Sequence, residues 1–196
     1  MKQLILASSS PRRIELLKKA GFRFRVIPSG INERSWEKRA TDPVELVKTL
    51  AIKKVKKAAS KLEEGIVVGA DTVVEIDGEI FGKPISIIEA RNMLKKLNGN
   101  FHNVYTGLAL LDVKSKKSLV DYEKTKVKFR KLNLRKIKSV SKNNLDKAGS
   151  YAIQDENTSL VEKIQGNYDN VVGLPVKKLR KMLSKLEKWV EERKNG

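Results

Sequence analysis

Two stretches of this 196-residue sequence carry side chains whose types and spacing could do chemistry. In the first, three serines and a proline lead into two arginines, from Ser8 to Arg13. Pro11 suits the first turn of a helix, where its missing N–H would have no partner, and Ser10 could cap the amides that follow. A helix start collects partial positive charge, and arginine presents paired donors to phosphate oxygens. The stretch therefore predicts a phosphate-binding turn, with a capped surface helix and solvated arginines as the alternative.

The second stretch places an acid directly after a buried strand. The apolar run 66–70 is typical of a strand covered on both faces, and Asp71 follows at its carboxyl end. A carboxylate there loses its hydration unless a cation or hydrogen-bond donors replace the water. We therefore predict that Asp71 is paired or binds a metal, the alternative being a structural turn or cap. Glu33, in a loop just past another strand, is a second candidate metal ligand, although most such loop acids are solvated.

Lys83 lies between Gly82 and Pro84 and invites comparison with a P-loop. The spacing does not fit, because three residues instead of four separate Gly78 from Gly82, and Pro84 replaces the hydroxyl that would bind magnesium. Lys83 could still deliver one cation to an oxyanion. A plain surface lysine in a turn is the alternative.

Alternating strands and helices must position these side chains. Asp42 and Ser86 are predicted as helix N-caps, and Asp77-Gly78 marks a hairpin turn. Strands are predicted at 3–7, 22–28, 66–70, 72–76, 101–111 and 124–130, and helices at 11–20, 43–62, 87–97, 134–145 and 175–193. Gln154 follows what reads as a further short strand within 147–155. Its amide carries both a donor and an acceptor, which suits reading a base edge, or it satisfies loop backbone.

Composition bounds the class of protein. The length fits one domain over residues 1–196, with two lobes and no separable linker. No cysteine is present, which excludes disulfides and thiolate chemistry, and the lone histidine, His102, is expected to be a strand-end hydrogen bonder instead of a zinc ligand. No apolar run reaches the length of a membrane span, so we expect a soluble, cytoplasmic protein.

The net charge of +19 raises a polyanion as partner. The lysines are spread through 48–61, 114–147 and 177–194 and do not form one tail. A solvated lysine-rich surface explains that spread without a ligand. The same positive field would also attract a small triphosphate.

Five blocks together resemble one protein family. They are Ala7-Ser8-Ser9-Ser10-Pro11-Arg12-Arg13, Val68-Gly69-Ala70-Asp71-Thr72-Val73-Val74, Gly82-Lys83-Pro84, Leu97-Asn98-Gly99-Asn100-Phe101-His102-Asn103-Val104-Tyr105-Thr106-Gly107 and Tyr151-Ala152-Ile153-Gln154. In this order they resemble the Maf family of nucleotide pyrophosphatases, and the match extends to Gly173-Leu174-Pro175. The block 149–154 is similar to the branch acting on dTTP and UTP and unlike the branch acting on 7-methyl-GTP.

The resemblance implies an α/β fold akin to inosine triphosphate pyrophosphatases, a two-lobed mixed sheet flanked by helices with a cleft between the lobes. It also implies hydrolysis of nucleoside triphosphates to monophosphate and pyrophosphate, and it is consistent with a homodimer. By family match, Asp71 is the proton acceptor and substrate choice involves Arg12, Thr72 and Gln154. Further cleft positions are Ser8, Arg13, Glu33 and Lys83. Asp155 stands where glycine is frequent, which bears on fine specificity.

The residue chemistry agrees with that activity. A triphosphate needs cations, here Arg12, Arg13 and Lys83, together with a divalent metal, magnesium or manganese, held by Glu33 and Asp71. The turn that includes Ser8 and Ser10 would bind phosphate, and the sequence leaves open whether Asp71 is the base, a metal ligand or both.

Two other functions stay open at this point. One is a pyrophosphatase for modified or purine nucleotides, and the other is a nucleic-acid-binding or cell-division regulatory protein that uses the positive surface. The sequence offers no aromatic stacking platform or recognition helix, so nucleic acid is not expected as the main ligand.

Overall fold

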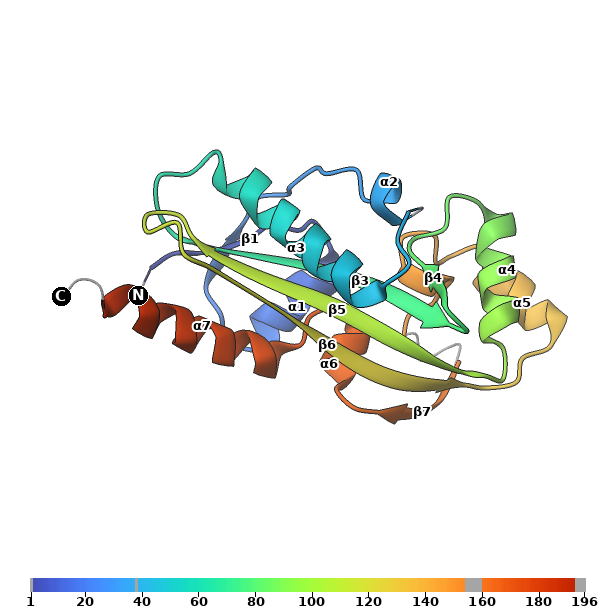
Figure 1. Cartoon of the computed structure of the whole chain (residues 1–196). Coiled ribbons are helices and arrows are strands. Elements are labelled where there is room, and N and C mark those ends of the chain that lie inside the picture. The colour runs from blue at the N-terminus through green and yellow to red at the C-terminus, as the bar shows by residue number, and fades with distance from the viewer. Residues whose placement is uncertain (1, 38, 154–159, 193–196) are drawn as a thin grey trace.

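The protein forms one seven-stranded mixed sheet with helices on both faces, seen in a computed structural model that describes residues 2–37, 39–153 and 160–192 (Figure 1). The strands are β1 (Leu4–Leu6), β2 (Phe24–Val26), β3 (Ile66–Ile76), β4 (Glu79–Phe81), β5 (Phe101–Asp112), β6 (Ser118–Phe129) and β7 (Val161–Gln165). The helices are α1 (Pro11–Lys19), α2 (Arg34–Glu37), α3 (Pro43–Ala59), α4 (Ile87–Leu97), α5 (Leu134–Val140), α6 (Tyr168–Val172) and α7 (Val176–Glu191), with a 3₁₀ turn η1 (Ala148–Ser150).

Three long antiparallel strands, β3, β5 and β6, form the spine of the sheet. The strand order is β2-β1-β3-β5-β6-β7, and β4 pairs with the far end of β3. One face of β3 carries two cores: Val68 packs with α1 and α7, and Val74 packs with α4 and α5. The opposite face, reached by Val67 and Val73, is covered by α3. Side chains alternate along a strand, so β3 serves both layers at once.

The sheet opens along one edge of β3. β1 runs parallel to β3 and leaves it after Leu6 pairs with Val68, while β4 joins the same edge only at Val74. Among the described strands, residues 69–73 therefore have a neighbour, β5, on one side only. Thr72 is partly exposed in this interval, whereas its neighbours on β3 are buried.

Helix α3 lies unusually close to the sheet. Asp42 caps its start by accepting a hydrogen bond from the Val44 amide at 2.8 Å, as its sequence predicts. A Cβ atom on Gly107 of β5 would lie 2.2 Å from the Val47 carbonyl oxygen, and one on Gly69 of β3 would lie 2.7 Å from that of Ala51. The two glycines thus permit an approach that any larger residue would block.

The structure corrects several expectations about elements. Strand β3 runs unbroken through Asp71, so this acid lies in the middle of a strand and not at its end, because β5 pairs with β3 throughout the interval. The segment before Gln154 forms the 3₁₀ turn η1 and not a strand. Helix α3 ends at Ala59 instead of residue 62, and α5 ends at Val140 instead of residue 145. The sequence did not predict helices α2 and α6 or strand β7.

Other expectations are confirmed. Asp77-Gly78 forms the β3–β4 hairpin turn with both residues at positive φ, and Ser86 caps α4 by accepting from the Glu89 amide. His102 Nε2 lies 2.7 Å from the Tyr151 hydroxyl inside the core. Burial lowers the pKa of His102 to about 4, which keeps the ring neutral in this structural role. Among the described helices, none is long and apolar enough to cross a membrane.

Candidate active site

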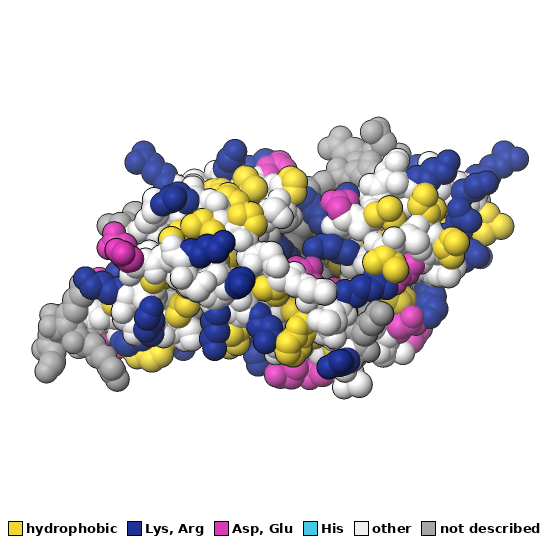
Figure 2. Space-filling model, turned by 90° about the horizontal axis from the view of Figure 1, so that it is seen from above, with side chains coloured by type: hydrophobic (Ala, Val, Ile, Leu, Met, Phe, Trp, Pro, Cys, Tyr) yellow, Lys and Arg dark blue, Asp and Glu magenta, His cyan; other side chains and the backbone are white. Residues whose placement is uncertain are grey.

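The open edge of β3 forms one side of a cavity of about 600 Å³. Figure 2 shows basic side chains scattered over the visible face and a hollow near its middle where basic and acidic side chains meet. The cavity brings together eight of the sequence-predicted residues: Ser8, Ser10, Arg12, Arg13, Glu33, Asp71, Thr72 and Lys83. Gln154 lies outside the described residues.

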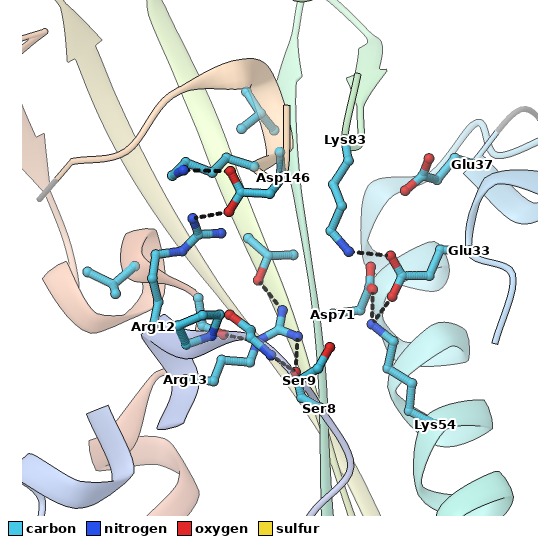
Figure 3. A pocket seen from close by; sticks show the side chains of 18 of the residues that line it. Ser8, Ser9, Arg12, Arg13, Glu33, Glu37, Lys54, Asp71, Lys83 and Asp146 are labelled. Atoms are coloured by element: carbon cyan, nitrogen blue, oxygen red, sulfur yellow. Dashed lines mark hydrogen bonds and ion pairs between the residues drawn. The ribbon is translucent and has the colours of Figure 1, made fainter. Parts of the chain in front are cut away.

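Asp71 lies at the buried end of an ion-pair network that runs through Lys54 and Glu33 to Lys83. Its Oδ1 accepts a hydrogen bond from Lys54 Nζ at 2.6 Å, and the same ammonium contacts Glu33 Oε1 at 2.6 Å and donates to the Ala70 carbonyl at 3.1 Å (Figure 3). Lys83 Nζ contacts Glu33 Oε2 at 2.8 Å. The side chains of Lys54 and Asp71 are 4% and 5% exposed, so screening by water is weak and each charge depends on its partners.

Glu33 is held ionised by this network. Burial acts to raise the pKa of its carboxyl, but the two lysine ammonium groups outweigh burial and lower the pKa to about 2. The outcome for Glu37, one turn further along the chain, is the opposite. Burial, followed by the negative charges of Asp71 and Glu33, raises the pKa of Glu37 to about 7. The carboxyl groups of Asp71, Glu33 and Glu37 therefore lie close enough to act on one another through their charges.

One atom of the network has no partner. Asp71 Oδ2 is buried and no donor among the described residues reaches it. An ionised oxygen left in that state is costly unless a cation or a water proton meets it. Glu33 contacts the same Lys54 ammonium as Asp71, so the free oxygen has a second carboxylate close to it. This arrangement fits a divalent metal, which Asp71 and Glu33 would hold.

A ligand would have to complete that metal site. Among the described residues, no group of three or more His, Cys, Asp or Glu side chains is arranged to hold a metal ion by itself. Magnesium characteristically uses one or two carboxylates together with substrate phosphates. Asp71 and Glu33 would supply two carboxylates of this kind, and the phosphates of a substrate would supply the remaining ligands.

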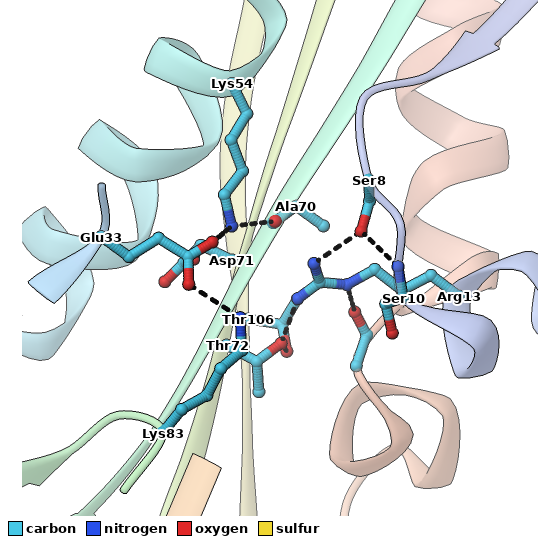
Figure 4. Close-up of polar contacts among 11 residues, drawn as sticks. Ser8, Ser10, Arg13, Glu33, Lys54, Ala70, Asp71, Thr72, Lys83 and Thr106 are labelled. Carbon is cyan, nitrogen blue, oxygen red and sulfur yellow. Dashed lines mark hydrogen bonds and ion pairs between the residues drawn. The ribbon is translucent and has the colours of Figure 1, made fainter. Parts of the chain in front are cut away.

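On the other face of β3, the Arg13 guanidinium organises a chain of hydrogen bonds whose acceptors are all neutral (Figure 4). Its Nε donates to the Gly173 carbonyl at 2.8 Å, Nη1 to Ser8 Oγ at 3.2 Å and Nη2 to Thr72 Oγ1 at 3.1 Å. Thr106 gives its hydroxyl proton to the Asn170 carbonyl, so Thr72 must donate to Thr106 across their 2.9 Å contact. Each Arg13 nitrogen thus already holds a protein acceptor.

The predicted cap by Ser10 is not formed. Ser10 occupies the N-cap position of α1, but its side chain accepts no amide, and its own N–H donates to Ser8 Oγ at 3.2 Å. Pro11 supplies no N–H, so within the described part of the chain the amides of Arg12 and Arg13 at the helix start have no side-chain acceptor. They add to the positive potential at this side of the cavity.

Arg12 contacts a residue that sequence reasoning did not single out. Its Nη1 lies 3.5 Å from Asp146 Oδ2, and Asp146 Oδ1 contacts Lys147 Nζ at 2.6 Å. Partial burial acts to raise the pKa of Asp146, but the hydrogen bond from Lys147 and the charges of Lys147 and Arg12 lower it. Asp146 is therefore an ionised acceptor at neutral pH.

Lys54 was also missed, and here the sequence does carry a signal. Residues 47, 51, 54 and 58 share one face of α3, and the other three are apolar and buried. A lysine within that stripe must bury its ammonium, which requires a carboxylate partner. Asp146 gives no comparable signal, because a single acid in a turn-rich loop is ordinarily solvated.

The site combines a buried carboxylate with one free oxygen, two lysines and the amides of a helix start around one cavity, which suits a hydrolase that holds a polyanion and activates water beside it. The Maf-like protein family model matches residues 3–186, so this chain belongs to the Maf family.

Curated relatives match along nearly the whole chain. The chain is 46% identical over 188 residues to a dTTP/UTP pyrophosphatase from Dictyoglomus thermophilum, covering 94% of this chain and 96% of the relative. It is 45% identical over 192 residues to a dTTP/UTP pyrophosphatase from Ruminiclostridium cellulolyticum, covering 97% and 99%. A solved HAM1 protein from Coxiella burnetii aligns with a TM-score of 0.45 at 16% identity, covering 66% of this chain and 73% of that one.

Proposed function

We propose that this protein hydrolyses dTTP and UTP to the nucleoside monophosphate and pyrophosphate. The observation that carries the proposal is the free Oδ2 of Asp71, which belongs to the same cavity as the Ser8–Arg13 turn. Relatives named dTTP/UTP pyrophosphatase at 45–46% identity support the substrate class.

Each half of the charged network has a role in this reaction. Lys54 fixes Asp71 through Oδ1. This leaves Oδ2 to hold the metal and, through its other lone pair, to accept the proton of the water that attacks the α-phosphorus. Lys83 has a side chain 55% exposed and can move from Glu33 to neutralise charge on the departing pyrophosphate. Asp71 and Lys83 are therefore the proposed catalytic residues.

The turn on the other side of β3 binds and positions the triphosphate. We assign phosphate contacts to the α1 amides and to the Ser8 and Ser10 hydroxyls, and we assign Arg13 the role of holding Ser8 and Thr72 in place. The proposed substrate-binding set is completed by Arg12, Thr72 and Gln154.

A divalent cation, magnesium or manganese, is proposed as the cofactor. Glu33 and Asp71 would hold it, and when bound it supplies positive charge to the phosphate oxygens. We also place the activity in the cytoplasm, since the chain has no cysteine and its substrates are nucleotides.

The experiment is pyrophosphate release from a panel of the eight common nucleoside triphosphates and 7-methyl-GTP, with Mg²⁺, Mn²⁺ or EDTA. We expect turnover of UTP and dTTP with either metal and loss of turnover in EDTA. Preferential release from 7-methyl-GTP or a purine nucleotide would contradict the pyrimidine assignment. Release of inorganic phosphate instead of pyrophosphate would contradict attack at the α-phosphorus.

A further inference from the structure

The Arg12–Asp146 pair lies across the cavity from the charged network. Figure 3 shows Lys54, Asp71, Glu33 and Lys83 on one side and Arg12 with Asp146 on the other, with open space between them. Asp146 comes from the loop after α5, and 134 residues separate it from Arg12 in the chain. The pair therefore joins the first helix to the segment that leads into η1.

A carboxylate is out of place in a subsite for phosphate. Asp146 already pairs with Arg12 and Lys147, and its carboxylate offers a ligand only acceptors, whereas the opposite side offers lysines and a metal-binding carboxylate pair to phosphate. The Arg12–Asp146 corner consequently suits the uncharged end of a nucleotide. Apolar residues that line the same cavity could cover the faces of a ring: Ala148, Tyr151, Ile153 and Val172.

The donor and acceptor pattern of the pair matches one kind of base edge. Arg12 has only donors and ionised Asp146 has only acceptors. Uracil and thymine present adjacent groups of the opposite kinds, the O4 acceptor and the N3–H donor. Cytosine presents an N4 amino donor and a bare N3 acceptor at the same two positions, so both groups would meet the wrong partner.

We propose that Asp146 is a specificity-determining residue that accepts the N3–H of uracil or thymine while Arg12 donates to O4, and that this pair rejects cytosine. The inference rests on the proposed function for the identity of the substrate. It assigns to Asp146 a direct contact with the base, and not only support of Arg12.

The test compares uracil with cytosine in the wild type and in Asp146→Asn. The asparagine amide can accept from N3–H or donate to a bare N3, so it should tolerate both bases. Dissociation constants would be measured for the α,β-imido analogues of UTP and CTP, and kcat and KM for UTP and CTP. Asp77→Asn, in the β3–β4 turn outside the cavity, is the matched control.

We expect the wild type to prefer uracil, and D146N to lose about tenfold to a hundredfold of that preference, mainly through affinity and KM. The analogue with a methyl group on N3 of UTP should bind poorly to the wild type, with a smaller penalty in D146N. An equal loss for UTP and CTP, or no preference in the wild type, would overturn the inference.

Failure of the proposed function gives a different result. A wild type that binds the imido analogue of UTP selectively but releases no pyrophosphate from UTP contradicts the hydrolase assignment and leaves the base reading supported. A wild type that hydrolyses UTP, with selectivity untouched by D146N, contradicts the base reading alone.

Discussion

The two faces of β3 at the cavity use polar groups in opposite ways. On the α3 face, Asp71 belongs to a network of full charges that leaves one carboxylate oxygen without a partner. On the other face, Thr72 belongs to a directional chain of neutral acceptors organised by Arg13 that ends at a backbone carbonyl. Asp71 and Thr72 are adjacent on β3 and point to opposite faces of the sheet. The α3 face thus carries out the reaction, and the other face positions the substrate. If that division is correct, variants on the two faces should fail differently.

The strongest test of the charged face is Asp71→Asn. The amide keeps the shape of the side chain but cannot accept a proton from water, so kcat for UTP should fall about a thousandfold. The measurement is pyrophosphate release under saturating UTP, with Asp77→Asn as control. A variant within twofold of the wild type would remove Asp71 from the reaction and end the contrast between the faces.

Lys54→Met tests whether the reaction on the α3 face of β3 needs the buried Lys54 ammonium. Two carboxylates would lose their common partner, and we expect kcat to fall about a hundredfold and the free energy of unfolding to fall by about 3 kcal/mol. Turnover and denaturant unfolding are the readouts. Lys57→Met, exposed on the same helix, is the matched control and should match the wild type in both.

Arg13→Lys tests the face of β3 on which Arg13 holds Ser8 and Thr72. A single ammonium cannot hold the acceptors that the three guanidinium nitrogens hold, so Ser8 and Thr72 should lose their fixed positions. We expect kcat/KM for UTP to fall about tenfold, mostly through a higher KM. Asp71→Asn, by contrast, should lower kcat. Arg23→Lys, at an exposed position, is the control. A fall confined to kcat would contradict the assignment of reaction to one face of β3 and substrate positioning to the other.

The smallest effect concerns Glu37 and pH. The pKa of Glu37 is raised to about 7, so its contribution to stability is present below the ordinary glutamate pKa of 4.5 and is lost as pH rises through about 7. Glu37→Gln carries no such titration. In EDTA, the wild type should therefore lose about 1 kcal/mol relative to E37Q between pH 5 and pH 8, a value reduced for partial exposure. Thermal unfolding of both proteins across this range measures it, and parallel curves would contradict the assignment.

Much of this site was readable from the sequence because its residues break a local pattern. Asp71 interrupts an apolar run, and the Ser8–Arg13 stretch pairs hydroxyls and cations with a helix-starting proline. Lys54 breaks a pattern as well, but lysines are so common in this chain that one more on α3 went unnoticed.

Other features depend on pairing between distant segments. Whether β3 ends at Ala70 or continues is decided by β5, which pairs with it for ten residues. Strand β7 shows no alternation of buried and exposed residues and forms because it pairs with the edge of β6. The role of Asp146 depends on its contact with Arg12, and no local sequence spacing predicts that contact.

The close seating of α3 on the sheet has a consequence for how this protein tolerates change. A methyl group at Gly107 would clash with the Val47 carbonyl and displace helix α3, which carries Lys54. The alanine variant would keep every polar group of the cavity and still misplace the buried ammonium. A saturation mutagenesis screen for activity should therefore record Gly107 and Gly69 as intolerant, although a survey of cavity-lining residues alone would overlook both.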